Sequence, residues 1–275
     1  MSASLVLQQP FDPAPALASL VAHAVPGVET VGTGTVTRVV LLGDEPALVE
    51  ATLGADRVAL RSSVGSEADL AALGASWFGL GDDLDAVLDA FGDDDVLGPL
   101  VRTRPRLRIL GHPDGFEAAV TTVLGQQVSL AAARTFGGRL AAAYGEPGPG
   151  GLTVYPTPER LAGVDPVELQ GVVRITHSRA RTLHALARAC ADGLHLSAPD
   201  AREHLLALPG IGPWTADYLA LRVLGDRDAM PVGDLVLRRA LGVASATDVT
   251  RLAERWRPLR AYAAVHLWTS TAYAL

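Results

Sequence analysis

The residues best suited to chemistry lie in one stretch, residues 208–234, which reads LPGIGPWTADYLALRVLGDRDAMPVGD. It contains a Gly-Pro turn, two aromatic residues four positions apart, Trp214 and Tyr218, and a lone carboxylate, Asp234, in a second Gly-Pro loop. A glycine-rich turn before a helix presents backbone N–H groups to a phosphate. Aromatic faces stack on planar or cationic groups, and an ionised carboxylate stabilises developing positive charge. The stretch therefore offers anion binding, stacking and electrostatic catalysis in close succession.

The turn is expected to join two helices, DAREHLLAL before it and PWTADYLALRVL after it. Pro209 ends the first helix, Gly210 and Gly212 permit positive φ and close backbone approach, and Pro213 suits the first position of the second helix. Phosphate contacts of this kind hold a protein on DNA without reading the base sequence. For this segment alone, a tight turn between helices that binds nothing is an equally good interpretation.

The aromatic pair and the aspartate also have plain structural interpretations when each is taken alone. Trp214 and Tyr218 share a helix face, and packing in the core is the simpler explanation for them. Asp234 precedes the apolar and arginine-containing helix LVLRRAL, where a carboxylate that caps the helix contributes about 1 kcal/mol. The spacing of the three residues relative to the turn is what favours a functional site.

The elements that must position these residues fall into two regions, of which the first, residues 1–100, is predicted to be an α+β domain with an antiparallel sheet and helices. DPAPALASLVAHAV is typical of a short amphipathic helix bounded by prolines. TVGTGTVTRVVLL, ALVEATLG and RVALRSS are predicted strands, rich in β-branched residues and separated by turn residues. SEADLAALGASWFGL and DDLDAVLDAFG return to a helical period.

The second region, residues 101–275, is predicted to be helical, so the fold class is mainly α with an α+β N-terminal domain. A helix-rich segment from Gly115 is followed by the proline-rich connector EPGPGGLTVYPTPERL. Helical patterns then run from HSRARTLHALARACADG to ERWRPLRAYAAVHLWTSTAY. Glycine and proline residues separate most of these segments, which indicates several helices with short connections.

Composition and charge limit the chemistry and the partners. All 23 basic residues are arginine, so no lysine side chain is present to form a Schiff base. Residues 1–100 carry 3 arginines against 15 acidic residues and residues 101–275 carry 20 against 15, so a nucleic-acid surface should lie in the second region. The single cysteine, Cys190, excludes an internal disulfide and a four-cysteine metal or iron–sulfur site. Neither a secretory signal nor a membrane-spanning run is found, so a cytoplasmic location is expected.

Taken together, these segments resemble the helix-hairpin-helix, Gly/Pro-loop, aspartate (HhH-GPD) signature of the DNA glycosylase superfamily. GFEAAVTTVLGQQVSLAAARTFGGRLAAAYGE is similar to the segment with which that family probes the duplex. AERWRPLRAYAAVHLW and FDPAPALASLVAHAVPGVETV are similar to the closing helix and the N-terminal domain of the alkylation-repair branch, 3-methyladenine DNA glycosylase II (AlkA type). The resemblance runs nearly end to end. It implies helical domains with a cleft between two helical subdomains, preceded by a small antiparallel-sheet (TBP-like) domain.

The resemblance also implies a role for individual residues. Asp234 corresponds to the catalytic aspartate, and the base pocket is expected to be lined by Trp214, Tyr218 and Trp268. The residues expected to contact DNA are Gly210, Ile211, Gly212, Gln126, Gln127 and Arg179. Gln127 corresponds to the residue that enters the gap left by the extruded nucleotide. The best-known member of the branch has an apolar wedge there, so the polar amide departs from the family pattern.

The function implied is that of a monofunctional DNA glycosylase, which hydrolyses the N-glycosidic bond of alkylated purines in double-stranded DNA without lyase activity. Two alternatives stay open: a glycosylase for deaminated or oxidised bases, and a DNA-binding module without catalysis. No metal or organic cofactor is expected for the chemistry, although a monovalent cation could bind the hairpin from Leu208 to Gly212. The expected partner is duplex DNA with a damaged base, bound by a monomer without any membrane.

Overall fold

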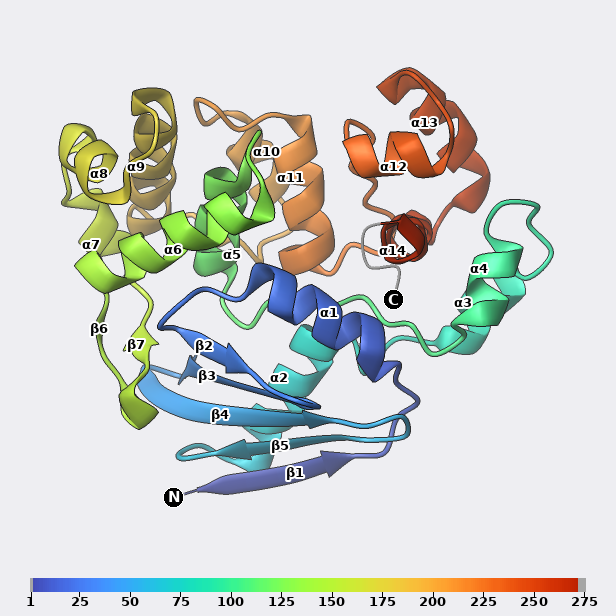
Figure 1. Cartoon of the computed structure of the whole chain (residues 1–275), viewed down its shortest axis with the longest axis horizontal. Coiled ribbons are helices and arrows are strands. Elements are labelled where there is room, and N and C mark those ends of the chain that lie inside the picture. Colours follow the sequence, from blue (N-terminus) through green and yellow to red (C-terminus); the bar gives the residue numbers. More distant parts are fainter. Residues whose placement is uncertain (1, 272–275) are drawn as a thin grey trace.

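The structure, a computed structural model, describes residues 2–271, and its N-terminal part is a five-stranded antiparallel sheet (Figure 1). The strands are β1 (Ala3–Leu7), β2 (Glu29–Val31), β3 (Thr35–Leu42), β4 (Glu45–Leu53) and β5 (Val58–Ser62), ordered β1-β5-β4-β3-β2. The predicted strand segments correspond to β2 through β5. β1 is not predicted, although Leu5, Val6 and Leu7 are apolar, because the segment is short and no adjacent segment of the sequence pairs with it. It pairs with β5, which is distant in the sequence.

One face of the sheet is buried by α1 (Pro13–His23) and α2 (Glu67–Phe78) (Figure 1). Every second residue of β4 from position 47 to position 53 is buried, as expected for a strand with one face in a core. The register pairs Val36 with Ala51 and Arg38 with Val49, so the same face of β3 is covered. Phe11, together with aromatic residues of α2, fills the space between sheet and helices.

The helices α3 (Leu84–Phe91) and α4 (Gly98–Thr103) leave the sheet and pack against the C-terminal helices (Figure 1). Phe91 and Val101 share a hydrophobic core with Trp256 and Tyr262. The domain boundary at residue 100 stays a prediction. The residues just before it contribute to the same core as the end of the chain.

The helical part of the chain is organised around two hydrophobic cores. The first is built from α5 (Gly115–Gly125), α6 (Leu130–Tyr144), α7 (Pro158–Ala162), α8 (Pro166–Val173), α9 (His177–Ala191), α10 (Ala201–Leu206) and α11 (Pro213–Leu219). The second joins α3 and α4 to η2 (Ala220–Leu224), α12 (Leu235–Ala240), α13 (Ala246–Ala253), η3 (Glu254–Trp256) and α14 (Arg260–Thr271). The predicted fold class, mainly α with an α+β N-terminal domain, is confirmed.

Two predicted segments are less regular than their patterns indicate. The connector after α6 contains a short ribbon, β6 (Glu146–Pro147) paired with β7 (Thr153–Val154). The C-terminal stretch that reads as one helical segment is divided between η3 and α14, because Pro258 between them lacks a backbone N–H. Residues 272–275, the end of the predicted helical region, lie outside the described residues.

Candidate active site

The hairpin between α10 and α11 has a backbone suited to an anion. Gly210 has φ +81°, a conformation that favours glycine. Gly212 is the N-cap of α11, and no side chain caps the first N–H groups of that helix. Ile211 is 6% exposed, so it can offer a ligand little more than its backbone.

Gly210→Ala is expected to lower the free energy of unfolding by about 2–4 kcal/mol. A Cβ atom there would lie 2.0 Å from Thr182 Oγ1, in addition to the strain of the positive φ. Gly171→Ala is the matched control because it lies inside α8 with nothing within 4 Å of the added carbon. This control is expected to raise stability by about 0.5–1 kcal/mol. Urea unfolding measures both variants, and equal stabilities would contradict the account of the hairpin.

Gln126, which follows α5, ties the hairpin to the segment expected to probe DNA. Its Nε2 donates to the Gly210 carbonyl oxygen at 3.0 Å and to Thr215 Oγ1 at 3.1 Å. The Arg179 guanidinium donates to the carbonyl oxygen of Gln126 and lies 6.0 Å from the ring of Phe136. Three of the predicted DNA-contact residues are therefore joined in one hydrogen-bonded group.

Gln127 lies at the tip of the turn between α5 and α6. Its side chain is exposed, and its φ of +53° falls in the left-handed region. A residue other than glycine is uncommon in that conformation, and such positions gather at functional sites. The turn presents the amide of Gln127 to solvent beside the group formed by Gln126, Arg179 and Gly210.

Asp234 is the N-cap of α12, and its carboxylate also has partners from two other helices. Oδ1 accepts hydrogen bonds from the backbone N–H groups of Val236 at 2.8 Å and Leu237 at 3.0 Å. It also accepts from Trp268 Nε1 at 3.1 Å, and Oδ2 accepts from Trp214 Nε1 at 2.9 Å. Four N–H donors thus act on two acceptor oxygens, as suits an ionised carboxylate. The two indoles fix its orientation.

Trp214, Tyr218 and Trp268 form a continuous aromatic surface next to this carboxylate. The rings of Trp214 and Tyr218 are stacked, with centroids 5.4 Å apart and an interplanar angle of 18°. The Tyr218 and Trp268 rings are 5.9 Å apart and tilted by 57°. None of the three side chains is fully buried. Packing in the core therefore accounts for only part of their surface, and the structure brings all three together with Asp234.

The aromatic surface and Asp234 line a cleft of about 400 Å³, a size suited to a base-sized ligand. The cleft is also lined by His23 on α1 and His112 before α5, which together are called its N-terminal wall. Burial and the nearby Arg222 lower the pKa of His23 to about 4, and burial lowers the pKa of His112 well below its usual value. Both rings are therefore neutral at physiological pH.

These three cleft residues were missed by the sequence analysis. Arg222 follows Tyr218 by four positions, so helical periodicity alone could have placed it on the same face. His23 and His112 have no comparable signal, because only the tertiary fold brings them to the helical motif.

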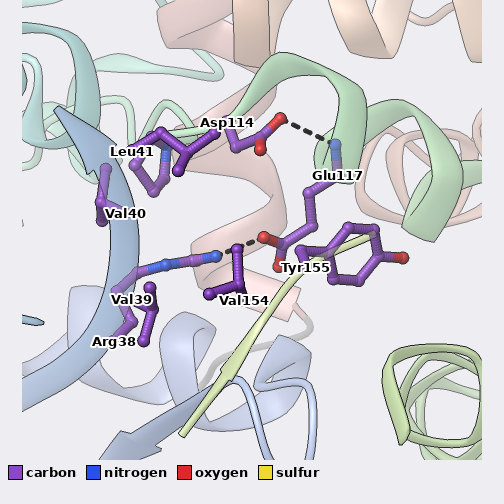
Figure 2. A pocket seen from close by; sticks show the side chains of 9 residues that line it. Arg38, Val39, Val40, Leu41, Asp114, Glu117, Val154 and Tyr155 are labelled. Atoms are coloured by element: carbon purple, nitrogen blue, oxygen red, sulfur yellow. Dashed lines mark hydrogen bonds and ion pairs between the residues drawn. The ribbon is translucent and has the colours of Figure 1, made fainter. Parts of the chain in front are cut away.

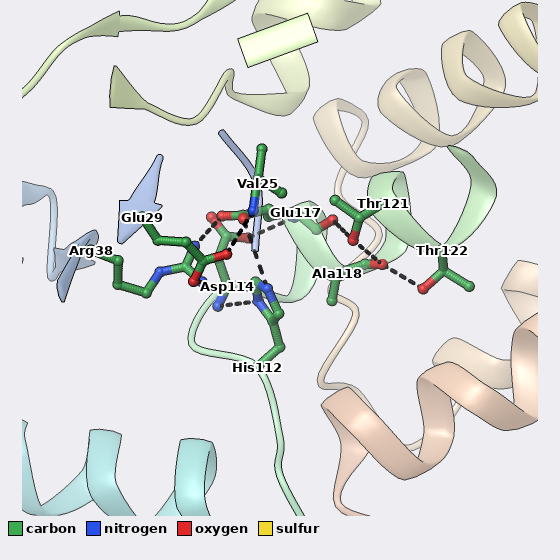
Figure 3. A network of polar contacts seen from close by, with 9 residues as sticks. All are labelled: Val25, Glu29, Arg38, His112, Asp114, Glu117, Ala118, Thr121 and Thr122. Atoms are coloured by element: carbon green, nitrogen blue, oxygen red, sulfur yellow. Dashed lines mark hydrogen bonds and ion pairs between the residues drawn. The ribbon is translucent and has the colours of Figure 1, made fainter. Parts of the chain in front are cut away.

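A buried polar network supports α5 where the sheet meets the helical part (Figure 3). Arg38 on β3 forms ion pairs with Glu29 at 3.3 Å and with Glu117 at 2.5 Å. The Asp114 side chain caps α5 by accepting from the Glu117 backbone N–H at 3.0 Å. Burial, with smaller contributions from Glu29 and Asp114, raises the pKa of Glu117 to about 8 although Arg38 opposes the shift. The network fixes the helix that carries Gln126 at its end.

Figure 2 shows a second, much smaller cavity beside this network. Its volume is about 20 Å³, and its lining includes Arg38, Glu117 and Tyr155. That space is sufficient for one water molecule. The cleft at Asp234, rather than this cavity, has the size required for a nucleobase.

Comparison with known families agrees with the fold. Residues 120–261 match the model of the HhH-GPD superfamily base excision DNA repair proteins, and residues 2–114 match the AlkA N-terminal domain. The chain belongs to the HhH-GPD superfamily, with an AlkA-type N-terminal domain, as the sequence resemblance predicts.

Individual relatives agree with this assignment. DNA-3-methyladenine glycosylase 2 of Escherichia coli is 34% identical, with coverage of 95% of this chain and 94% of the relative. The probable bifunctional transcriptional activator/DNA repair enzyme AlkA of Mycobacterium tuberculosis is 41% identical over 98% of this chain. The match spans only 57% of that longer relative. The 3-methyladenine DNA glycosylase of Archaeoglobus fulgidus has the same fold, with a TM-score of 0.84 at 20% identity over 98% of this chain and 99% of that one.

Residues 2–271 contain neither a metal-ligating cluster nor a membrane-spanning helix. No group of three or more His, Cys, Asp or Glu side chains in this part is placed to hold a metal ion. None of its helices combines the length and the apolar character needed to cross a bilayer.

Proposed function

We propose that this chain is a monofunctional DNA glycosylase that removes alkylated purines, of the 3-methyladenine and 7-methylguanine type, from double-stranded DNA. The observation that carries the proposal is the position of Asp234. Its carboxylate is held by two indole N–H groups at the wall of a cleft lined by Trp214, Tyr218 and Trp268. A carboxylate and an aromatic surface that share one cleft can act on the sugar and the base of the same nucleotide.

The proposed reaction begins with rotation of the damaged nucleotide out of the duplex, at a cost of a few kcal/mol. The aromatic faces of Trp214 and Tyr218 then stack on the base and attract a positively charged one by about 0.5–2 kcal/mol. The N-glycosidic bond breaks with its electron pair passing to the base nitrogen, so a cationic base leaves as a neutral molecule. Asp234 stabilises the positive charge that develops on the deoxyribose. Water adds at C1′ and releases a proton, which leaves an abasic site.

Ordinary glycosidases use two carboxyl groups, one of which protonates the leaving group. An alkylpurine that already carries a positive charge does not require that proton. A single carboxylate is then sufficient. The other carboxylate among the described residues that line the cleft, Glu29, forms an ion pair with Arg38 at 3.3 Å.

DNA binding is assigned to the hairpin and to the end of α5. Backbone N–H groups of Gly210 and Gly212 bind a phosphate near the lesion, in keeping with the uncapped start of α11. Ile211 lies between them and closes the turn, because its N–H donates to the Leu208 carbonyl oxygen at 3.2 Å. Gln127 enters the gap left by the nucleotide, and Gln126 and Arg179 support it from behind. The Arg179 guanidinium also supplies positive charge to this surface.

The absence of lysine from the sequence supports hydrolysis without strand cleavage, because no lysine amine can attack the sugar. No cofactor takes part in the proposed chemistry. The carbonyl oxygens of Leu208, Gly210 and Gly212 each accept one hydrogen bond and retain a second lone pair, so a monovalent cation fits there as a structural ligand. The proposed working form is a cytoplasmic monomer on duplex DNA.

Chromatography of the bases freed from a methylated duplex tests the proposal. The protein is expected to release 3-methyladenine and 7-methylguanine and to leave the strand intact until alkali cleaves the abasic sites. Tight binding of the duplex without any freed base would refute the enzyme and support the DNA-binding module. Release confined to hypoxanthine or 8-oxoguanine would support the alternative glycosylase.

A further inference from the structure

Among the residues that the structure describes, one arginine in the cleft has a guanidinium without a protein acceptor. Four arginines line the cleft: Arg38, Arg108, Arg134 and Arg222. Arg38 is paired with two glutamates. Arg108 donates to three backbone carbonyl oxygens, and Arg134 donates to the Ala24 carbonyl oxygen. Arg222 contacts the Tyr218 ring, and within residues 2–271 its guanidinium has neither a hydrogen-bond acceptor nor a carboxylate within ion-pair distance.

Arg222 lies at the aromatic surface of the cleft. It belongs to the π-helical turn η2, which continues α11, and its guanidinium carbon is 6.0 Å from the centre of the Tyr218 ring. Its positive charge also acts across the cleft on His23 and His112, whose pKa values it lowers. The guanidinium therefore faces the space between the aromatic surface and the N-terminal wall.

This position has two physical consequences for a base that enters the cleft. The guanidinium carries five N–H donors and needs acceptors when a ligand displaces water from it. Purines offer such acceptors at their edges, for example N7 and O6. The guanidinium also places a fixed positive charge beside Tyr218, so it opposes the attraction of that ring for a second cation.

We propose that Arg222 is a specificity-determining residue: it donates hydrogen bonds to the acceptor edge of the extruded base and reduces the advantage that the aromatic faces give a cationic base over a neutral one. The inference rests on the proposed glycosylase function and names a residue that sets how strongly its cleft favours cationic bases. Two unit charges about 6 Å apart repel each other. This repulsion lowers the binding constant of a cationic base about 3-fold in bulk water and about 100-fold at an effective dielectric constant of 20.

The acceptor bound by Arg222 has two possible sources, the base itself or a DNA phosphate, and the experiment separates them. The kcat/KM for base release is measured on two duplexes of identical sequence, one with neutral hypoxanthine and one with cationic 7-methylguanine. For Arg222→Gln, the ratio of hypoxanthine release to 7-methylguanine release is expected to fall about 10-fold. Arg222→Lys keeps the charge and is expected to stay within about 3-fold of the original ratio.

Arg61→Gln is the matched control, because it removes the same charge from an exposed position on β5, away from the cleft. It should leave the ratio unchanged. If Arg222→Gln lowered both activities equally, Arg222 would bind phosphate or serve the fold, and the inference would be wrong. An unmodified protein that released only the cationic base would also overturn it. Release of neither base would instead refute the glycosylase function itself.

Discussion

Asp234→Asn is expected to reduce kcat for base release by about 10²–10³-fold, which corresponds to about 2.7–4 kcal/mol of lost transition-state stabilisation. The substitution removes the negative charge that faces the sugar and keeps an oxygen that can cap α12. Asparagine is as good an N-cap as aspartate, so the stability of the helix should change little. Single-turnover release of 7-methylguanine measures the rate, and an electrophoretic shift of the duplex measures binding, which should persist.

Asp165→Asn is the matched control for this experiment. Asp165 caps α8 by accepting from the Val167 backbone N–H at 2.7 Å, and it does not line the cleft. The same change of charge and the same capping role are thus tested away from the site, and activity is expected to remain. If Asp234→Asn kept full activity and bound the duplex normally, the proposed role of the Asp234 carboxylate in the reaction would be wrong.

Arg38→Met is expected to lower the free energy of unfolding by about 3–5 kcal/mol at pH 9, because it leaves two buried carboxylates without their cation. Arg38 and Glu117 are each 2% exposed at the side chain, and Glu29 is 7% exposed. The loss should be smaller at pH 6, where Glu117 carries its proton. Denaturant unfolding at the two pH values measures the difference, and a loss that is equal at both would contradict this account of the network.

Glu117→Gln separates the charge of this residue from its packing. Burial raises the pKa of Glu117 from 4.5 to about 8, so the folded state binds a proton that the unfolded state has released. The stability that this proton contributes is present below pH 4.5 and is lost as the pH rises to about 8. The variant should lack that part of the pH dependence. A variant whose stability declined across this window as steeply as the original protein would rule Glu117 out as its source.

Local sequence patterns were sufficient for most of the fold. Strands β4 and β5 alternate buried residues with more exposed ones, and capping residues precede many helices, so their positions follow from short-range physics. β1 depends on pairing with β5, and α4 depends on a core shared with α14. Such contacts join segments that are distant in the sequence, so the local pattern of residue types does not reveal them.

The candidate site was predictable to the extent that its residues share one helix or loop. The spacing of Trp214 and Tyr218 places both on one face, and Asp234 is visible as a helix cap. The hydrogen bonds from the two indoles to this carboxylate join three helices and could not be read from spacing. The N-terminal wall of the cleft, with His23 and His112, was unpredictable for the same reason.

The most direct test of the mechanism is a crystal structure of the protein bound to a duplex that carries a non-hydrolysable sugar analogue at the lesion. The account predicts an extruded nucleotide with its base against Trp214 and Tyr218, and with C1′ within about 4 Å of the Asp234 carboxylate. A nucleotide that stayed stacked in the duplex, or that entered the protein away from Asp234, would contradict it.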